Sequence, residues 1–207
     1  MKPVNAQQSD QLLYCDHLGA AKDDATDVMS FTVSRPEGAG LVAYLQRRAF
    51  FDEARGLMRT YLVRDQKSNE IVGYFSLKAG LVSVNEREES FYDEKTGEER
   101  IETAFDTLPG VELANFAVNS SFVEKHKNFK GVGKVIFHQF VLPIVRKTAE
   151  DVGVTALYVF ALPYDSLIQH YRESFGFERL GEPHEELLHK RMKPLYDRSC
   201  VFMFLFL

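Results

Sequence analysis

The sequence predicts a mixed α/β fold of the α+β type, and three patterns indicate it. Thr155–Leu162 is a nearly continuous apolar run, which is typical of a buried strand. Val111–Val118 also has strand character, and the helical pattern Gly131–Asp151 lies between the two. A strand, a helix and a strand in that order imply a right-handed crossover with parallel strands. Thr60–Arg64 and Ile71–Lys78 read as an antiparallel hairpin.

The remaining elements follow from periodicity and turn residues. We expect helices over Asp10–Met29 and Gly38–Leu57, where apolar residues recur at helical spacing. Ser166–Phe175 reads as a short helix. Pro143 lies inside the Gly131–Asp151 pattern, where its missing N–H predicts a kink.

Two segments leave alternatives open. Val84–Pro109 is strongly acidic around the turn residues Glu94–Gly97, and reads as a solvated hairpin or mobile loop, or as an electrostatic lip for a cationic amine. Cys200–Leu207 reads as a terminal strand. It would complete the sheet within one subunit or pair with a neighbour's edge in a homodimer.

Composition indicates a single domain over residues 1–207. The chain is 45% apolar with a net charge of −5, as expected of a globular protein that is not a general polyanion binder. No apolar run approaches the ~20 residues that span a bilayer, and no secretory pattern opens the chain, so we expect a cytoplasmic protein without a membrane. Cys15 and Cys200 fit no metal-ligand spacing, and no metal is predicted.

The stretch from Val111 to Gly133 predicts an anion site. A strand leads into a loop that contains Lys125, Lys127, Lys130 and Lys134 and that closes on Gly131-x-Gly133 before a helix. Glycines let the backbone approach a phosphate, and the first turn of a helix offers unpaired N–H groups and a positive dipole. Val135 excludes a Walker loop, and Ile136 excludes the dinucleotide fingerprint.

What remains, Asn128-x-x-Gly131-x-Gly133, resembles the Gln/Arg-x-x-Gly-x-Gly/Ala coenzyme A motif of the GNAT N-acetyltransferase superfamily, with Asn128 as a departure. Asn115–Val118 and Ala156–Ala161 are similar to strands four and five of that superfamily. Tyr171–Phe177 resembles its Tyr-x-x-x-Gly-Phe helix ending with one extra residue. The resemblance covers roughly residues 30 to 180, and the layout is similar to the branch containing toxins that acetylate charged tRNA.

The resemblance implies a central mixed sheet of about six to seven strands flanked by helices, with coenzyme A between two splayed parallel strands. It implies acetyl-coenzyme A as co-substrate and direct acetyl transfer to a primary amine of a small molecule, a peptide or an aminoacyl-tRNA. The implied cofactor-binding residues are Phe116, Ala117, Val118, Asn128, Lys130, Gly131, Val132, Gly133, Lys134 and Tyr164.

Two residues are candidates for proton transfer. Tyr171 is the candidate acid toward the coenzyme A sulfur, with an aromatic packing role as the alternative. Glu112 stands five residues before Ala117, at the position of the glutamate base in the histone acetyltransferase branch, with a solvated surface role or a water base as alternatives. Three functions stay open: a general N-acetyltransferase, a toxin-like enzyme acting on aminoacyl-tRNA, and a non-catalytic acyl-coenzyme A binding domain.

Overall fold

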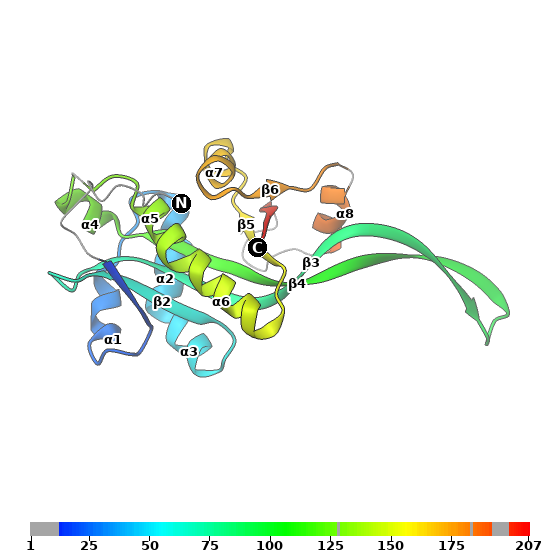
Figure 1. Ribbon diagram of the computed structural model, residues 1–207, viewed down its shortest axis with the longest axis horizontal. Helices are drawn as coiled ribbons and strands as arrows, with labels where there is room; N and C mark the ends of the chain where they lie inside the picture. Colours follow the sequence, from blue (N-terminus) through cyan, green and yellow to red (C-terminus); the bar gives the residue numbers. More distant parts are fainter. Residues whose placement is uncertain (1–12, 128, 183, 192–198) are drawn as a thin grey trace. The chain divides into compact units, whose positions relative to one another are not determined.

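The computed structural model describes residues 13–127, 129–182, 184–191 and 199–207 and contains a seven-stranded mixed sheet (Figure 1). The strands follow the order β1-β2-β3-β4-β5-β7-β6 across the sheet. Only β4 and β5 pair in parallel among the recorded pairings. The strands are β1 (Leu13–His17), β2 (Arg59–Asp65), β3 (Ile71–Asp93), β4 (Glu98–Val118), β5 (Ala156–Ala161), β6 (Glu178–Arg179) and β7 (Val201–Phe206).

The helices are short and several end in irregular turns. They are α1 (Asp24–Asp27), α2 (Ala39–Arg47), α3 (Ala49–Ala54), α4 (Ser120–Lys125), α5 (Val132–Ile136), α6 (Leu142–Val152), α7 (Asp165–His170) and α8 (His184–Arg191). Turns of 3-10 helix cover Val28–Ser30 and Pro36–Gly38, and π-helical turns cover Phe137–Val141 and Tyr171–Phe175. None of the helices within the described ranges is both long enough and apolar enough to cross a bilayer.

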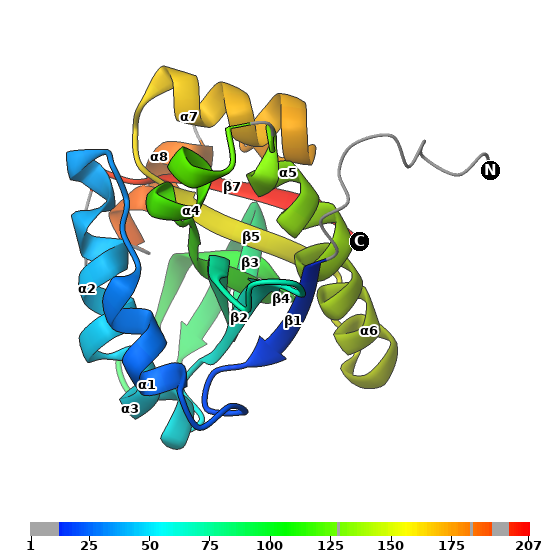
Figure 2. The ribbon, with the colours of Figure 1, turned by 90° about the vertical axis from the view of Figure 1, so that its left-hand side faces the viewer.

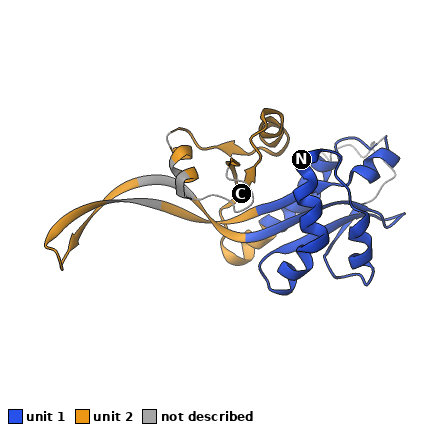
Figure 3. Cartoon of the chain, turned by 180° about the vertical axis from the view of Figure 1, so that it is seen from behind, with its two compact units in different colours: residues 1–78, 113–145 blue, residues 79–112, 146–207 orange. Residues whose placement is uncertain are grey.

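The chain forms two compact units, each built from two separate segments (Figure 3). Unit 1 comprises residues 1–78 and 113–145, and unit 2 comprises residues 79–112 and 146–207.

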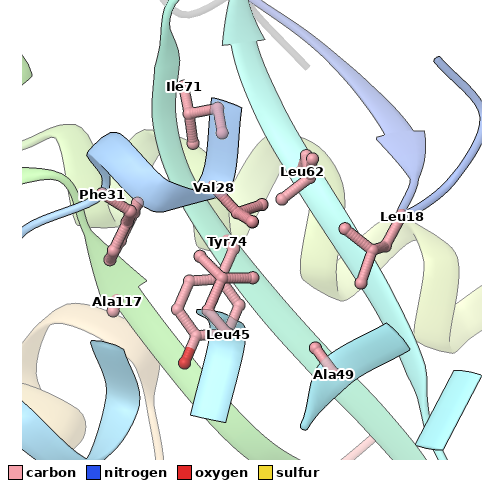
Figure 4. Packing of buried hydrophobic residues seen from close by; sticks show 9 residues of the cluster. All are labelled: Leu18, Val28, Phe31, Leu45, Ala49, Leu62, Ile71, Tyr74 and Ala117. Atoms are coloured by element: carbon pink, nitrogen blue, oxygen red, sulfur yellow. The ribbon is translucent and has the colours of Figure 1, made fainter. Parts of the chain in front are cut away.

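Unit 1 packs helices on both faces of β3. Tyr74 is fully buried, its ring meets Phe31 edge-on at 5.2 Å, and its hydroxyl donates to the Leu41 carbonyl in α2 at 2.7 Å (Figure 4). The preceding residue, Gly73, faces the other way, where an added Cβ would lie 2.6 Å from Ile136 Cδ1 in α5. Successive residues of a strand face opposite sides of the sheet, so Gly73 and Tyr74 pack against different helices. Figure 2 shows α2 and α5 on opposite sides of the sheet that contains β3.

The expected helix over Asp10–Met29 is wrong over Leu13–His17, and only its end from Asp24 is helical. Leu13–His17 instead forms an edge strand whose register pairs Cys15 with Val63 of β2, and helical structure begins only at Asp24. The edge of β2 supplies hydrogen-bond partners that the local apolar spacing does not reveal.

Unit 2 has its own aromatic core, which holds β7 inside the sheet. Phe202 is fully buried and its ring lies 5.6 Å from the rings of Tyr158 and Phe160 in β5. β7 pairs with β5 on one side and with β6 on the other. The terminal strand therefore completes the sheet within one subunit, which is the first of the two alternatives that the sequence left open.

The acidic segment forms the distal part of a regular hairpin between β3 and β4. Gly97, at φ +69°, closes the turn by donating its N–H to the Asp93 carbonyl at 2.8 Å. Phe91, Tyr92 and Ile101 beside this turn are exposed. The segment is therefore a hairpin, and the strands run much further than the predicted end at Lys78.

Candidate coenzyme A site

A buried asparagine fixes the end of β4. Asn119 donates through Nδ2 to the Ile71 carbonyl at 2.8 Å, and its Oδ1 accepts from the N–H groups of Ser121 at 3.2 Å and Thr32 at 3.3 Å. The bond to Ser121 caps the start of α4. Our sequence reasoning missed Asn119, although an Asn-Ser-Ser run after a strand is a typical helix start.

The helix start after the loop is open. Gly131 has φ +71° and ψ 25°, a left-handed conformation that favours glycine, and it makes no side-chain cap bond to α5. A Cβ added at Gly131 would meet nothing within 4 Å. The N–H groups in the first turn of α5 are therefore available to an anion, and the positive end of the helix dipole also favours an anion there.

This helix start lies directly against the end of β4. A Cβ added at Gly133 would lie 3.6 Å from Val118 Cγ2 and 3.7 Å from the Phe116 ring. The structure therefore brings the predicted strand residues and the predicted glycine turn together within unit 1. The open start of α5 fits a pyrophosphate, and the adjoining end of β4 fits the extended arm of a ligand such as coenzyme A.

Exposed lysines surround the opening. Lys127, Lys130 and Lys134 are exposed, and no ion pair is recorded for any of them among the described residues. Lys125 instead pairs with Glu70, and this hydrogen bond lowers the pKa of that carboxyl. Asn128, a predicted cofactor residue, lies outside the described residues.

The ladder between β4 and β5 is short. It consists of the pairs Gly110 with Ala156, Val111 with Leu157 and Glu112 with Tyr158. Within the described part of the chain, no pairing with β5 is recorded for Phe116–Val118. The recorded ladder between the two strands therefore ends at Glu112.

Tyr171 belongs to unit 2 and lies in a π-helical turn. The turn ends at Gly176, with φ +80°, and the Phe177 N–H donates back to the Tyr171 carbonyl at 3.1 Å. A π turn holds one residue more than an α turn. It therefore accommodates the extra residue between the tyrosine and the glycine of the predicted motif.

The Tyr171 side chain is 7% exposed and packs edge-on against the rings of Phe175 and Phe177, each at 5.5 Å. Burial raises the pKa of Tyr171, and the nearby Cys200 adds to this effect. The phenol therefore keeps its proton at neutral pH and is a hydrogen-bond donor.

Glu112 is buried, in contrast to a solvated residue at a strand entrance, and is 4% exposed. Its register partner on β5 is the buried Tyr158, whose pKa is raised by burial and by the neighbouring Glu112. Tyr164, the other predicted residue of unit 2, is 46% exposed and precedes α7. Sequence reasoning gave Tyr158 no role, because its contact with Glu112 depends on strand pairing.

No family model matches the chain. Solved structures do match. AtaTR bound with acetyl-coenzyme A shares 18% identity over 94% of this chain and 92% of that chain, with a TM-score of 0.58. AtaT complexed with acetyl-methionyl-tRNAfMet shares 15% identity over 94% of each chain, with a TM-score of 0.59. A tyrosine-to-phenylalanine variant of the AtaT toxin with the antitoxin AtaR C-terminus and acetyl-coenzyme A shares 17% identity over 94% and 93%, with a TM-score of 0.56.

At these identities the similarity establishes the fold. Together with the seven-stranded mixed sheet flanked by helices, it confirms the predicted GNAT fold.

Proposed function

We propose that this chain, which has the GNAT fold, is an acetyl-coenzyme A dependent N-acetyltransferase whose acceptor is the α-amine of an aminoacyl-tRNA. The observation that carries the proposal is the uncapped start of α5 at Gly131, open to solvent and lying against the end of β4. The similarity to AtaTR with acetyl-coenzyme A supports the co-substrate, and the similarity to AtaT with acetyl-methionyl-tRNAfMet supports the acceptor.

The co-substrate would be held mainly by backbone. The amides of Gly131, Val132 and Gly133 would bind its pyrophosphate, with Lys130 and Lys134 adding charge. The backbone of Phe116, Ala117 and Val118 would bind the pantetheine arm and polarise the thioester carbonyl. Tyr164 is the candidate contact from unit 2. Acetyl-coenzyme A supplies an activated acetyl group.

Two side chains would handle protons. Glu112 would accept a proton from the acceptor ammonium, directly or through one water, and this frees the nitrogen lone pair for attack on the thioester. The new C–N bond forms as the C–S bond breaks. Since burial keeps Tyr171 protonated, its hydroxyl would donate a hydrogen bond to the departing sulfur.

The distribution of charge supports an RNA acceptor. Residues 79–112 contain ten acidic and three basic residues, a net charge of −7, whereas the whole chain has −5. The rest of the chain therefore carries +2. Exposed lysines outside residues 79–112 would attract the phosphate backbone of RNA, while the acidic segment 79–112 would repel it.

The test incubates the purified chain with acetyl-coenzyme A and methionyl-tRNAfMet, following free thiol and the mass of the aminoacyl group. Uncharged tRNA, free methionine and a lysine peptide are the comparison acceptors. We expect thiol release with the charged tRNA alone. Release with the lysine peptide instead would overturn the RNA acceptor but keep the acetyltransferase, and tight binding without any release would favour a non-catalytic acyl-coenzyme A binding domain.

A tyrosine variant tests the donor role. Tyr171→Phe should lower the turnover number at least about tenfold, because it removes one hydrogen bond to a developing charge, with an unchanged dissociation constant for acetyl-coenzyme A. Tyr92→Phe is the matched control, since it removes a hydroxyl that is 70% exposed on the hairpin. Equal turnover in both variants would return Tyr171 to a packing role.

A further inference from the structure

The distal part of the hairpin between β3 and β4 has two different faces (Figure 1). Two ion pairs join its strands, Arg87 with Asp106 at 3.4 Å and Arg100 with Asp93 at 3.8 Å. Arg87 and Asp93 are six positions apart on β3, and Arg100 and Asp106 are six positions apart on β4. Side chains that pair across two strands project from the same face, and an even separation along a strand keeps that face. These four residues therefore define one face, which we call the paired face.

Charge on the paired face is balanced within the hairpin. Arg87 also pairs with Glu89 at 2.6 Å, so each arginine of residues 79–112 is bound to a carboxylate of this face. Lys95, the remaining basic residue of the segment, lies in the turn, where its backbone N–H donates to the Asp93 carboxylate at 2.9 Å. The basic side chains of the strands are therefore all on the paired face.

The opposite face, which we call the open face, carries no basic residue over 88–92 and 99–101. By the same alternation it comprises Glu88, Ser90 and Tyr92 of β3 with Glu99 and Ile101 of β4. All five side chains are exposed, and the two large apolar ones are 70% exposed each. Within the described ranges, no ion pair is recorded for either glutamate.

This combination of side chains fits a protein partner. An exposed ribbon needs polar side chains to stay in solution, and the two glutamates supply them. Tyr92 and Ile101 do not serve that purpose, and apolar side chains at this exposure gain free energy when a partner covers them. Charge then selects the partner, because carboxylates that no described residue neutralises attract lysine and arginine and repel phosphate.

We propose that the open face is a docking surface for a basic segment of another protein, in which lysine or arginine alternates with aliphatic side chains. The cations would pair with Glu88 and Glu99, and the aliphatic side chains would cover Tyr92 and Ile101. A second copy of this chain fits less well, because a twofold contact would place the acidic face against itself. The proposal goes beyond the proposed function, because it requires no acetyl transfer.

Two adjacent glutamates provide the test and its control. Glu99 belongs to the open face and Glu98 to the paired face, and both are exposed. The probe is a short fluorescent peptide of alternating lysine and leucine, and anisotropy measures its dissociation constant for the purified full chain. We expect Glu99→Lys to raise this constant at least about tenfold and Glu98→Lys to change it less than about twofold. Equal weakening by both variants, or no binding to the wild type, overturns the proposal.

A second pair of variants tests the apolar contact. Ile101→Ser should raise the dissociation constant at least about fivefold, whereas Phe91→Ser, at a 48% exposed position of the paired face, should leave it near the wild-type value. Because all four substituted positions are exposed, each variant should keep the wild-type melting temperature. A lysine and serine peptide that binds as tightly as the lysine and leucine peptide would show attraction by charge alone and overturn the proposal.

Sedimentation velocity tests the competing occupant. We expect the chain to sediment in the same way with and without the Ile101→Ser change. A dimer that dissociates in Ile101→Ser but persists in Phe91→Ser would assign the open face to a second copy, and this result would also overturn the basic partner.

Discussion

Replacing Gly131 by alanine separates the role of its backbone from the role of the space beside it. The residue has φ +71°, and a non-glycine residue in this region costs about 1–2 kcal/mol. An added methyl group meets no atom within 4 Å, so no clash adds to this cost in the free protein. We expect Gly131→Ala to lower the free energy of unfolding by that amount and no more.

Gly131→Ala should also weaken the binding of acetyl-coenzyme A, for a reason separate from its effect on stability. If the pyrophosphate of acetyl-coenzyme A occupies the open space at Gly131, the methyl group would hold it away from the helix amides. We expect the dissociation constant to rise at least about tenfold, which corresponds to about 1.4 kcal/mol. Isothermal titration calorimetry measures this constant, and urea unfolding followed by circular dichroism measures stability.

Gly153 provides a matched control. It ends α6 with φ +66°, and an added Cβ there also meets nothing within 4 Å. Gly153→Ala should therefore lose the same unfolding free energy and bind acetyl-coenzyme A like the wild type. If Gly131→Ala shows the stability loss but a wild-type dissociation constant, the helix start does not bind the cofactor and our reasoning fails.

Four further predictions concern stability and reactivity. Arg64 is 2% exposed and pairs with Asp24 at 2.7 Å, so Arg64→Met should cost about 3–5 kcal/mol in urea unfolding by leaving the buried carboxylate of Asp24 without its cationic partner, and a loss below about 1 kcal/mol would contradict this. Burial raises the pKa of the Cys15 thiol to about 12. At pH 8.5, iodoacetamide should therefore modify Cys15 at least about tenfold more slowly in the folded chain than in urea. Peptide mass measures the extent of modification. Because this pKa is raised in the folded state, its contribution to stability is complete below about pH 9 and is lost as the pH rises toward about 12, a dependence that Cys15→Ser should remove. Gly80→Ala should cost about 1–3 kcal/mol in unfolding, since its methyl group meets the Tyr158 hydroxyl, and wild-type stability would show that the ring is free to move.

Much of the cofactor site could be predicted because its determinants are local. The glycine turn, the strand before it and the helix after it are contiguous in sequence, and glycine spacing and apolar periodicity report directly on backbone conformation. The Gly131 turn and the acidic hairpin therefore appear where the sequence indicated them. The extra residue after Tyr171 was also visible in the sequence, although the π-helical turn that accommodates it was not.

The sequence by itself determined the mixed sheet, the parallel crossover and the glycine turn that opens α5, because each follows from residues a few positions apart. Only the tertiary structure decided that Leu13–His17 is a strand, that Tyr171 is enclosed by aromatic rings and that Glu112 is buried opposite Tyr158. Those features depend on partners between 4 and about 50 positions away, and burial and strand register arise only when the distant segments pack together.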